Sequence, residues 1–534
     1  MTQDPSSLDR RTFLQVAMAA GAAATLAPSV HAQAPQTQGP VLEEATLDQL
    51  QAGMTEGHWT AEQLVGACQA RIAALDAAGP KLNAVLELNP DALALARALD
   101  AERQAGKVRG PLHGIPVLIK DNLETADRMK TTAGSLALAD APAPTQDATA
   151  VLRLRLAGAV ILGKTNLSEW ANFRSTHSSS GWSGRGGQTR NPYALDRTPS
   201  GSSSGSGVAT SASLCAVAVG TETDGSIVSP SAACGLVGIK PTVGLVSRAG
   251  IIPISHTQDT AGPMARTVRD AAILLGALAG ADPRDPATAQ AQVQSDYTRF
   301  LHLDGLEGAR LGVVTNLLGQ QPHVDAVIRP ALDLLKARGA TLVEVELKTT
   351  PYDAAELDVL LYEFKTDLNA YLAGRGGAVK DLVSLMAYDD AHRDTEMPFF
   401  GQELLQQAQA KGPLTDPAYA KALAACAQAR QDITGLLAQH QLQALVGPTG
   451  GTPWLIDLVN GDSGSGPSFS SPAAVGGCPH ITVPAGFAFG LPVGLSFVAG
   501  PWQEPQLLTL AYAFEQYRNA RRPPRFLPTA PLQA

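Results

Sequence analysis

The sequence is poor in charge and has no extended basic segment. Only 17% of its 534 residues are Asp, Glu, Lys or Arg, and the formal net charge is −9. Lysine and arginine occur singly or in isolated pairs. Binding of nucleic-acid phosphates needs a basic face, so no nucleic acid is expected as a partner. The hydrophobic fraction of 45% is that of a globular chain and argues against disorder.

Cysteine is scarce as well, and its spacing offers neither a disulfide framework nor a metal site. The cysteines are odd in number, widely scattered and without a CxxC pair: Cys68, Cys215, Cys234, Cys426 and Cys478. We therefore expect free, mostly buried thiols. The sequence contains no HExxH motif and no phosphate-binding loop, so neither a metal ion nor an organic cofactor is expected.

Long hydrophobic runs are lacking except near the N-terminus. The apolar run there, Val16–Ala27, is about half as long as a membrane span. It follows Arg10 and Arg11 and precedes small residues ending at Ala32, which resembles a twin-arginine export signal. An ordinary amphipathic helix with a chance arginine pair is the alternative. We expect residues 1–32 to be a signal peptide that engages the twin-arginine export machinery. The mature protein is then expected in the periplasm or outside the cell, soluble and without stable membrane insertion.

The length and patterning of the chain indicate an α/β fold. A chain of 534 residues is too long for one ordinary core, so one lobed domain or two domains are expected. The segments "NAVLELN" and "GIPVLIKDN" are typical of strands, and "ALALARALDAERQ" is typical of a helix. Thr60 and Gln63 have the spacing of a capping box at a helix start. This alternation predicts a buried, largely parallel sheet.

Residues from about 265 to 440 differ from the rest of the chain. They are mainly of helical pattern and rich in Ala, Gln and Leu. Strand patterns resume with "LQALVGP", "HITVPAGF" and "VGLSFVAG". We therefore expect a single domain over residues 41–528 with a helical insertion around residues 265–440.

A stretch rich in Ser, Gly, Arg and Pro extends from Ser175 to Gly207. A structureless segment of this length inside a domain is uncommon and usually functional. It contains a literal GxSxG motif centred on Ser203. The residues before the motif are polar and interrupted by Pro, whereas a nucleophile elbow needs a strand there. An α/β-hydrolase esterase with a Ser-His-Asp triad at Ser203 is therefore only an alternative.

Ser226 is a second candidate nucleophile. It follows turn-forming residues that end at Gly225, and the next residues can start a helix whose backbone N–H groups are available to an oxyanion. None of the ten histidines lies in a motif that marks it as the partner base.

Lys120 is the other candidate base, because it ends the apolar run "GIPVLIK" at the edge of the expected sheet. The ordinary interpretation is a strand-end lysine paired with Asp121. A general base must be neutral, and holding an unshifted lysine neutral at pH 7 costs about 4.6 kcal/mol. Burial must supply most of this free energy.

Several long segments resemble the amidase signature family, among them "GIPVLIKDN", "PSGSSSGSG", "GTETDGSI", "GLVGIKPTVGLVSRAGIIP" and "PHITVPAGF". The resemblance covers nearly all of the chain after the expected signal peptide. It implies a large mixed, mostly parallel central sheet covered by helices. It also implies amide hydrolysis, without a cofactor, by a Lys, a cis-peptide Ser and a nucleophilic Ser, which correspond to Lys120, Ser202 and Ser226. The backbone N–H groups implied to form the oxyanion hole belong to Thr223, Asp224, Gly225 and Ser226.

Within the family, "TETDGS", "SSSGWSGRGGQTRNPY", "LYEFKTDLNAYL" and "DTEMPFFGQEL" are most similar to bacterial members that hydrolyse C-terminal amides of peptides. The resemblance therefore implies a peptide or small-molecule amide as substrate, with a free acid and ammonia as products. An amidase for small aryl or acyl amides is the first alternative. A glutaminase subunit of an amidotransferase and an inactive binding protein are weaker ones. Asp224 stands where many members have Gly, and Val228 where many have Arg, and the role of the acidic side chain stays open.

Overall fold

The computed structural model describes residues 39–348 and 352–532, and these described residues form one compact unit. The expected signal peptide, residues 1–32, lies outside the described residues. Within the described ranges, no helix is long and apolar enough to cross a membrane.

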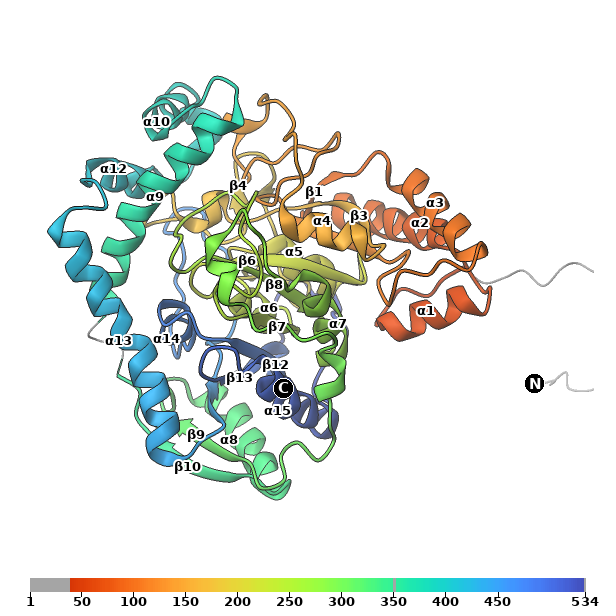
Figure 1. The fold of residues 1–534 in the computed structure, drawn as a ribbon, viewed down its shortest axis with the longest axis vertical. Helices are drawn as coiled ribbons and strands as arrows, with labels where there is room; N and C mark the ends of the chain where they lie inside the picture. Colours follow the sequence, from red (N-terminus) through yellow and green to blue (C-terminus); the bar gives the residue numbers. More distant parts are fainter. Residues whose placement is uncertain (1–38, 349–351, 533–534) are drawn as a thin grey trace, which may run out of the picture. The chain divides into compact units, whose positions relative to one another are not determined.

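A mixed sheet of 11 strands runs through this unit, in the order β1-β3-β2-β6-β8-β7-β12-β13-β11-β9-β10 (Figure 1). The strands are β1 Val85–Leu88, β2 Pro116–Lys120, β3 Val160–Thr165, β6 Val217–Glu222, β7 Val237–Lys240, β8 Thr260–Ala265, β9 Arg310–Val314, β10 Thr341–Val345, β11 Ala444–Pro448, β12 His480–Ala488 and β13 Leu491–Val498. A separate small ladder joins β4 Trp182–Ser183 to β5 Gly187–Gln188.

The sheet confirms the expected α/β class but is less parallel than expected. Strands β3, β2 and β6 pair in parallel, as do β11, β9 and β10. Every pairing between β6 and β11 is antiparallel. Strand β13 is buried along its whole length. An antiparallel strand covered on both faces loses the usual apolar–polar alternation, and its sequence then looks like that of a parallel strand.

Helices cover the sheet, and their bounds are α1 Leu47–Thr55, α2 Ala61–Ile72, α3 Ala92–Gln104, α4 Thr149–Leu156, α5 Ser204–Ser211, α6 Val228–Ala233, α7 Val268–Leu278, α8 Pro322–Ala337, α9 Asp353–Arg375, α10 Leu382–Ala391, α11 Arg393–Glu396, α12 Glu403–Ala410, α13 Pro417–His440, α14 Ser470–Val475 and α15 Glu504–Arg518. A π-helical turn spans Ala73–Ala77, and 3-10 turns span Leu136–Leu138, Glu169–Asn172, Pro286–Gln290, Thr298–Phe300 and Thr315–Leu317.

Two short helices, α5 and α6, follow directly after the segments that carry the candidate residues Ser202 and Ser226. Helix α5 packs against β2, β6 and β8, whereas α6 packs against β7, β12 and β13. Helices α9, α10, α12 and α13 lie along one side of the unit, at the left of Figure 1. Apolar residues of α9, including Leu360, Phe364 and Leu368, form a second core with Trp170 and Ile254.

The helical signals of the sequence are confirmed where they were strongest. Thr60 and Gln63 form a capping box at the start of α2. Residues 265–440 are mainly helical, as expected. The expectation that this region contributes no strands to the sheet is wrong, because β9 and β10 lie within it and form one edge of the sheet. Both strands have only five residues and alternate with longer helical segments, so their pattern was hidden by that of the helices.

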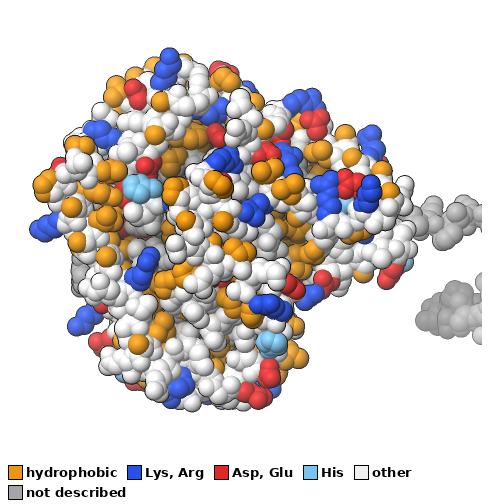
Figure 2. Space-filling model, viewed as in Figure 1, with side chains coloured by type: hydrophobic (Ala, Val, Ile, Leu, Met, Phe, Trp, Pro, Cys, Tyr) orange, Lys and Arg blue, Asp and Glu red, His pale blue; other side chains and the backbone are white. Residues whose placement is uncertain are grey.

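Charged side chains are spread thinly over the face of the molecule that Figure 2 draws, with acidic and basic groups interspersed. This distribution agrees with the low charged fraction of the sequence.

Candidate active site

Lys120 ends strand β2 and is fully buried. Its ammonium nitrogen donates to the Ser202 hydroxyl at 2.7 Å, the Thr221 hydroxyl at 2.9 Å and the Thr221 carbonyl at 3.3 Å. Asn122 also donates to the Thr221 hydroxyl, at 3.0 Å. The lysine is therefore held on three fixed oxygen atoms, one of which belongs to a serine.

Burial lowers the pKa of Lys120 to about 7, although Asp259 and Glu222 act in the opposite direction. A lysine with this pKa is substantially neutral at physiological pH and can accept a proton. Asp121, the partner of the ordinary ion-pair interpretation, instead accepts hydrogen bonds from Thr132 and lies near Arg185.

Ser202 is buried and follows a cis peptide bond from Gly201. Its carbonyl accepts a hydrogen bond from the backbone N–H of Ser168 at 3.1 Å. A Cβ atom at Gly201 would lie 2.2 Å from the Ser168 hydroxyl, and one at Gly205 would lie 2.3 Å from a backbone oxygen. These close approaches explain why glycine is needed at both positions, and they show that this stretch packs tightly against its neighbours.

The hydroxyl of Ser203 binds strand β6 both as a donor and as an acceptor. The hydroxyl donates to the Thr221 carbonyl at 3.0 Å and accepts from the Thr221 N–H at 3.1 Å. The residues before it form no strand. A hydroxyl occupied in this way supports the fold, so the esterase interpretation of Ser203 finds no support in the geometry.

Ser226 lies in the turn between β6 and α6 and is only 8% exposed. Its carbonyl accepts a hydrogen bond from the N–H of Ser203 at 3.2 Å, which joins this turn to the loop that carries Ser202. Gly225 has φ +76°, a conformation that glycine adopts without strain. The structure thus brings Lys120, Ser202 and Ser226 to one place.

The turn Thr223–Ser226 offers unused hydrogen-bond donors. In the part of the chain that the structure describes, none of its four backbone N–H groups donates to a protein atom. The N–H groups of Ile227 and Val228, by contrast, donate to the buried carboxylate of Glu222 at 2.8 and 3.0 Å. The donors left over are those that the resemblance implies for the oxyanion hole.

Asp224, the departure from glycine in this turn, is fixed by helix α14. Its carboxyl oxygen accepts a hydrogen bond from Ser471 at 2.6 Å. Burial raises the pKa of Asp224, and hydrogen bonds from Ser470 and Ser471 act in the opposite direction. Val228 is fully buried, and nothing in the structure explains why it replaces Arg.

Sequence reasoning did not single out Thr221, Asn122, Gln258 or Asp259. Thr223 donates from its hydroxyl to Asp259 at 2.6 Å and accepts from Gln258 at its carbonyl at 3.3 Å. A signal did exist for Thr221, which is a polar residue on a strand buried throughout. No sequence pattern marks Gln258 or Asp259, because both contact Thr223, which lies 35 and 36 residues away from them in the chain.

One cluster in the described residues has the composition of a metal site, namely His256, Glu363 and Asp367. Glu363 already accepts hydrogen bonds from Ser255, Thr257 and Tyr419, and His256 Nδ1 lies 2.8 Å from Asp367. Carboxylate oxygens that already accept hydrogen bonds from several donors favour an ion pair over a cation site.

The five cysteines are free and buried, as expected.

The amidase family matches residues 63–508, which is most of the chain, and these residues include the whole lysine–serine cluster. The chain belongs to the amidase signature family. A native peptide amidase from Stenotrophomonas maltophilia has a similar structure, with a TM-score of 0.87 and 52% identity, covering 90% of this chain and 99% of that one.

Other members of the amidase signature family are also similar in sequence. A probable amidase of Arabidopsis thaliana is 40% identical over 497 residues, which cover 91% of this chain and 92% of the relative. A glutamyl-tRNA(Gln) amidotransferase subunit from Roseiflexus sp. is 36% identical over 491 residues, covering 89% of this chain and 97% of the relative. The chain is an amidohydrolase that acts on C–N bonds.

Proposed function

We propose that this amidohydrolase removes the C-terminal amide of peptides and releases ammonia. The observation that carries the chemistry is the buried hydrogen bond of 2.7 Å between Lys120 and Ser202. The similarity to a peptide amidase over 90% of the chain supports the choice of substrate. The two other relatives are a probable amidase and a subunit of an amidotransferase, so the likeness to the peptide amidase carries the choice of a peptide amide as substrate.

The proposed reaction uses three side chains in sequence. Neutral Lys120 accepts the hydroxyl proton of Ser202, and Ser202 takes the proton of Ser226 as Ser226 attacks the amide carbonyl carbon. The N–H groups of the turn Thr223–Ser226 stabilise the resulting oxyanion. The C–N bond breaks as the relay returns a proton to the leaving nitrogen. Water then hydrolyses the ester on Ser226, which regenerates the enzyme.

The leaving group distinguishes this reaction from that of a peptidase. Ammonia needs almost no volume beyond the carbonyl carbon, whereas an internal peptide bond would place a chain there. Walls that close this side reject internal bonds by steric clash. The segments "LYEFKTDLNAYL" in α9 and "DTEMPFFGQEL" around α11 and α12 are the candidates for cleft walls.

Mass spectrometry tests this proposal. An amidated peptide is expected to gain about one dalton at its C-terminus, while the same peptide as a free acid stays intact. Ser226→Ala should abolish this change and keep the fold, and Ser203→Ala should retain substantial activity. Activity confined to small amides such as benzamide would favour the alternative substrate class, and internal fragments would contradict the proposed specificity.

We further propose that residues 1–32 direct export through the twin-arginine machinery to the periplasm or beyond. The support is the Arg10–Arg11 pair followed by a short apolar run and small residues before Ala32. Replacing both arginines by lysine should leave the protein in the cytoplasmic fraction. Unchanged export of this variant would refute the proposal.

A further inference from the structure

Gln258 connects the oxyanion turn to helix α9. It is nearly fully buried, and its amide nitrogen donates to the Thr223 carbonyl at 3.3 Å and to a Glu356 carboxylate oxygen at 2.9 Å. Both partners are acceptors, so only the amide nitrogen can face them, and this fixes the orientation of the side chain.

The contact with Thr223 has a direct geometric consequence for the oxyanion hole. The Thr223 carbonyl and the Asp224 N–H belong to one planar peptide unit and point in opposite directions. A donor that holds the Thr223 carbonyl therefore also sets the direction of the Asp224 N–H. That N–H is one of the unused donors in the turn that carries Ser226.

The loop that carries Gln258 is itself held in place by α9. Glu356, Glu363 and Asp367 lie seven and four residues apart, so they share one face of the helix. Glu363 accepts hydrogen bonds from Ser255 and Thr257, and Asp367 accepts from the His256 backbone N–H at 3.0 Å.

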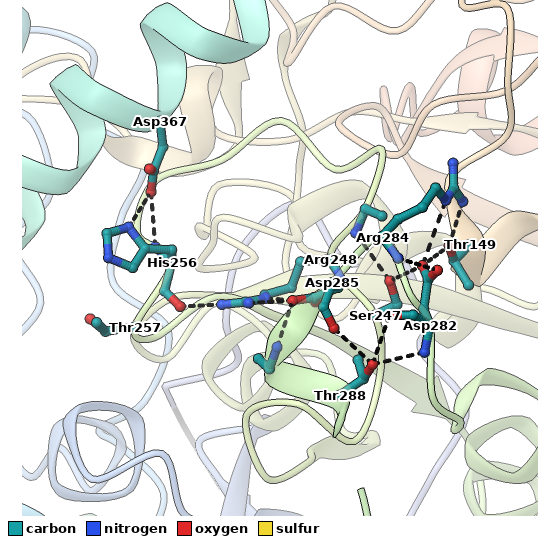
Figure 3. Close-up of polar contacts among 12 residues, drawn as sticks. Thr149, Ser247, Arg248, His256, Thr257, Asp282, Arg284, Asp285, Thr288 and Asp367 are labelled. Carbon is teal, nitrogen blue, oxygen red and sulfur yellow. Dashed lines mark hydrogen bonds and ion pairs between the residues drawn. The ribbon is translucent and has the colours of Figure 1, made fainter. Parts of the chain in front are cut away.

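The same loop is also anchored on its other side, as Figure 3 shows. Arg248 donates to the His256 carbonyl and forms an ion pair with Asp285, whose carboxylate accepts from the Arg248 Nε at 2.9 Å. Asp259 accepts from the N–H groups of Ile254 and Ser255 at 2.8 and 2.9 Å. A loop fixed at so many points presents Gln258 in one position before substrate arrives.

We propose that Gln258, oriented by Glu356, is a positioning residue that aims the Asp224 N–H at the oxyanion. The inference rests on the proposed role of Ser226 and its turn. It assigns a function in transition-state stabilisation to a contact between α9 and the loop Ser255–Asp259. An interaction that acts mainly in the transition state changes kcat more than KM.

The first test is the substitution Gln258→Leu, which keeps the approximate volume and removes both donors. Its kcat is expected to fall about tenfold to 100-fold, with KM nearly unchanged. The matched control is Gln439→Leu, at an exposed glutamine near the end of α13, which should keep the kcat of the wild type. A thermal melt confirms that each variant is folded. A folded Gln258→Leu enzyme with normal kcat, or with a loss confined to KM, would overturn the proposal.

The second test, Gln258→Glu, separates positioning from simple packing. The protonated carboxyl can donate to the Thr223 carbonyl, whereas the ionised one cannot and lies beside the Glu356 carboxylate. The other charged groups nearby are Asp224, which shares a hydrogen bond with Glu356, Asp259, which is the next residue in the chain, and Arg430, which lines a cavity together with Gln258. As the pH falls, the new carboxyl gains its proton and can donate, so the ratio of variant to wild-type kcat should rise several-fold. The ratio is used because dividing by the wild-type kcat removes the titration of Lys120, which both enzymes share. A ratio that does not vary with pH would contradict the proposal.

The substrate choice keeps this outcome separate from the proposed function. The kcat of Gln258→Leu and the kcat of Gln258→Glu, each divided by that of the wild type, are measured on an amidated peptide and on a small amide. Should the wild type hydrolyse only the small amide, the peptide specificity fails while the kcat ratios still decide the role of Gln258.

Discussion

At the scale of single residues, the pKa of Lys120 decides when the site is active. Burial lowers this pKa to about 7, so the side chain loses its proton as the pH rises through neutrality. The rate should therefore rise on an acidic limb centred near pH 7, which is far below the usual range of lysine. Lys120→Ala should lower kcat/KM by about 10²–10⁴-fold, and a pH–rate profile measures both effects.

Lys120→Arg is the sharper control for this interpretation. The guanidinium group keeps the positive charge but cannot become neutral in a protein. It should be as inactive as the alanine variant at every pH. An arginine variant with substantial activity, or an alanine variant that keeps the acidic limb, would show that proton transfer to Lys120 is not required.

At the scale of elements, the turn between β6 and α6 requires glycine at position 225. A Cβ atom there would lie 2.9 Å from the Ser229 hydroxyl and 3.0 Å from the Ser470 hydroxyl, at a φ of +76°. Gly225→Ala should lower the free energy of unfolding by about 1–2 kcal/mol and kcat by about 10²-fold, because the oxyanion donors move. Urea unfolding and steady-state kinetics measure the two effects.

Gly435→Ala is the matched substitution in α13, where the new methyl group meets nothing within 4 Å. It should raise the free energy of unfolding by up to about 1 kcal/mol through helix propensity and leave kcat unchanged. Equal kcat losses in the two variants would contradict a specific role for the turn.

At the scale of the whole molecule, the sequence predicts local features well and contacts between distant segments of the chain poorly. The capping box of Thr60 and the end of β2 at Lys120 depend on neighbouring residues, so their patterns are visible in the sequence. The lysine–serine pair spans 82 residues and was found only through the family resemblance. The bond from Gln258 to Glu356 spans 98 residues and had no motif to mark it. Such contacts depend on the order of the strands in the sheet. Hydrophobic periodicity and composition do not determine that order.

The pH dependence of stability also belongs to the whole molecule, because partly or fully buried carboxyls tie distant segments together. Glu515 in α15 accepts a hydrogen bond from the Val268 N–H at the start of α7, at 2.7 Å. Burial raises the pKa of Glu515 to about 8. The unfolded chain loses this proton near pH 4.5, so between about pH 4.5 and 8 the folded protein binds the proton and the unfolded chain does not. The free energy of unfolding therefore falls as the pH rises through this window.

Glu515→Gln removes this titration and keeps an oxygen that can accept from Val268. The variant should match the wild type at pH 5 and exceed its free energy of unfolding by about 2–4 kcal/mol at pH 9. Urea unfolding at the two pH values measures the difference. Glu307→Gln, the same substitution at an exposed glutamate, should follow the wild type at both pH values. A Glu515→Gln variant that is less stable than the wild type at pH 9 would mean that the ionised carboxylate stabilises the fold, because its bond to α7 outweighs the cost of burying the charge.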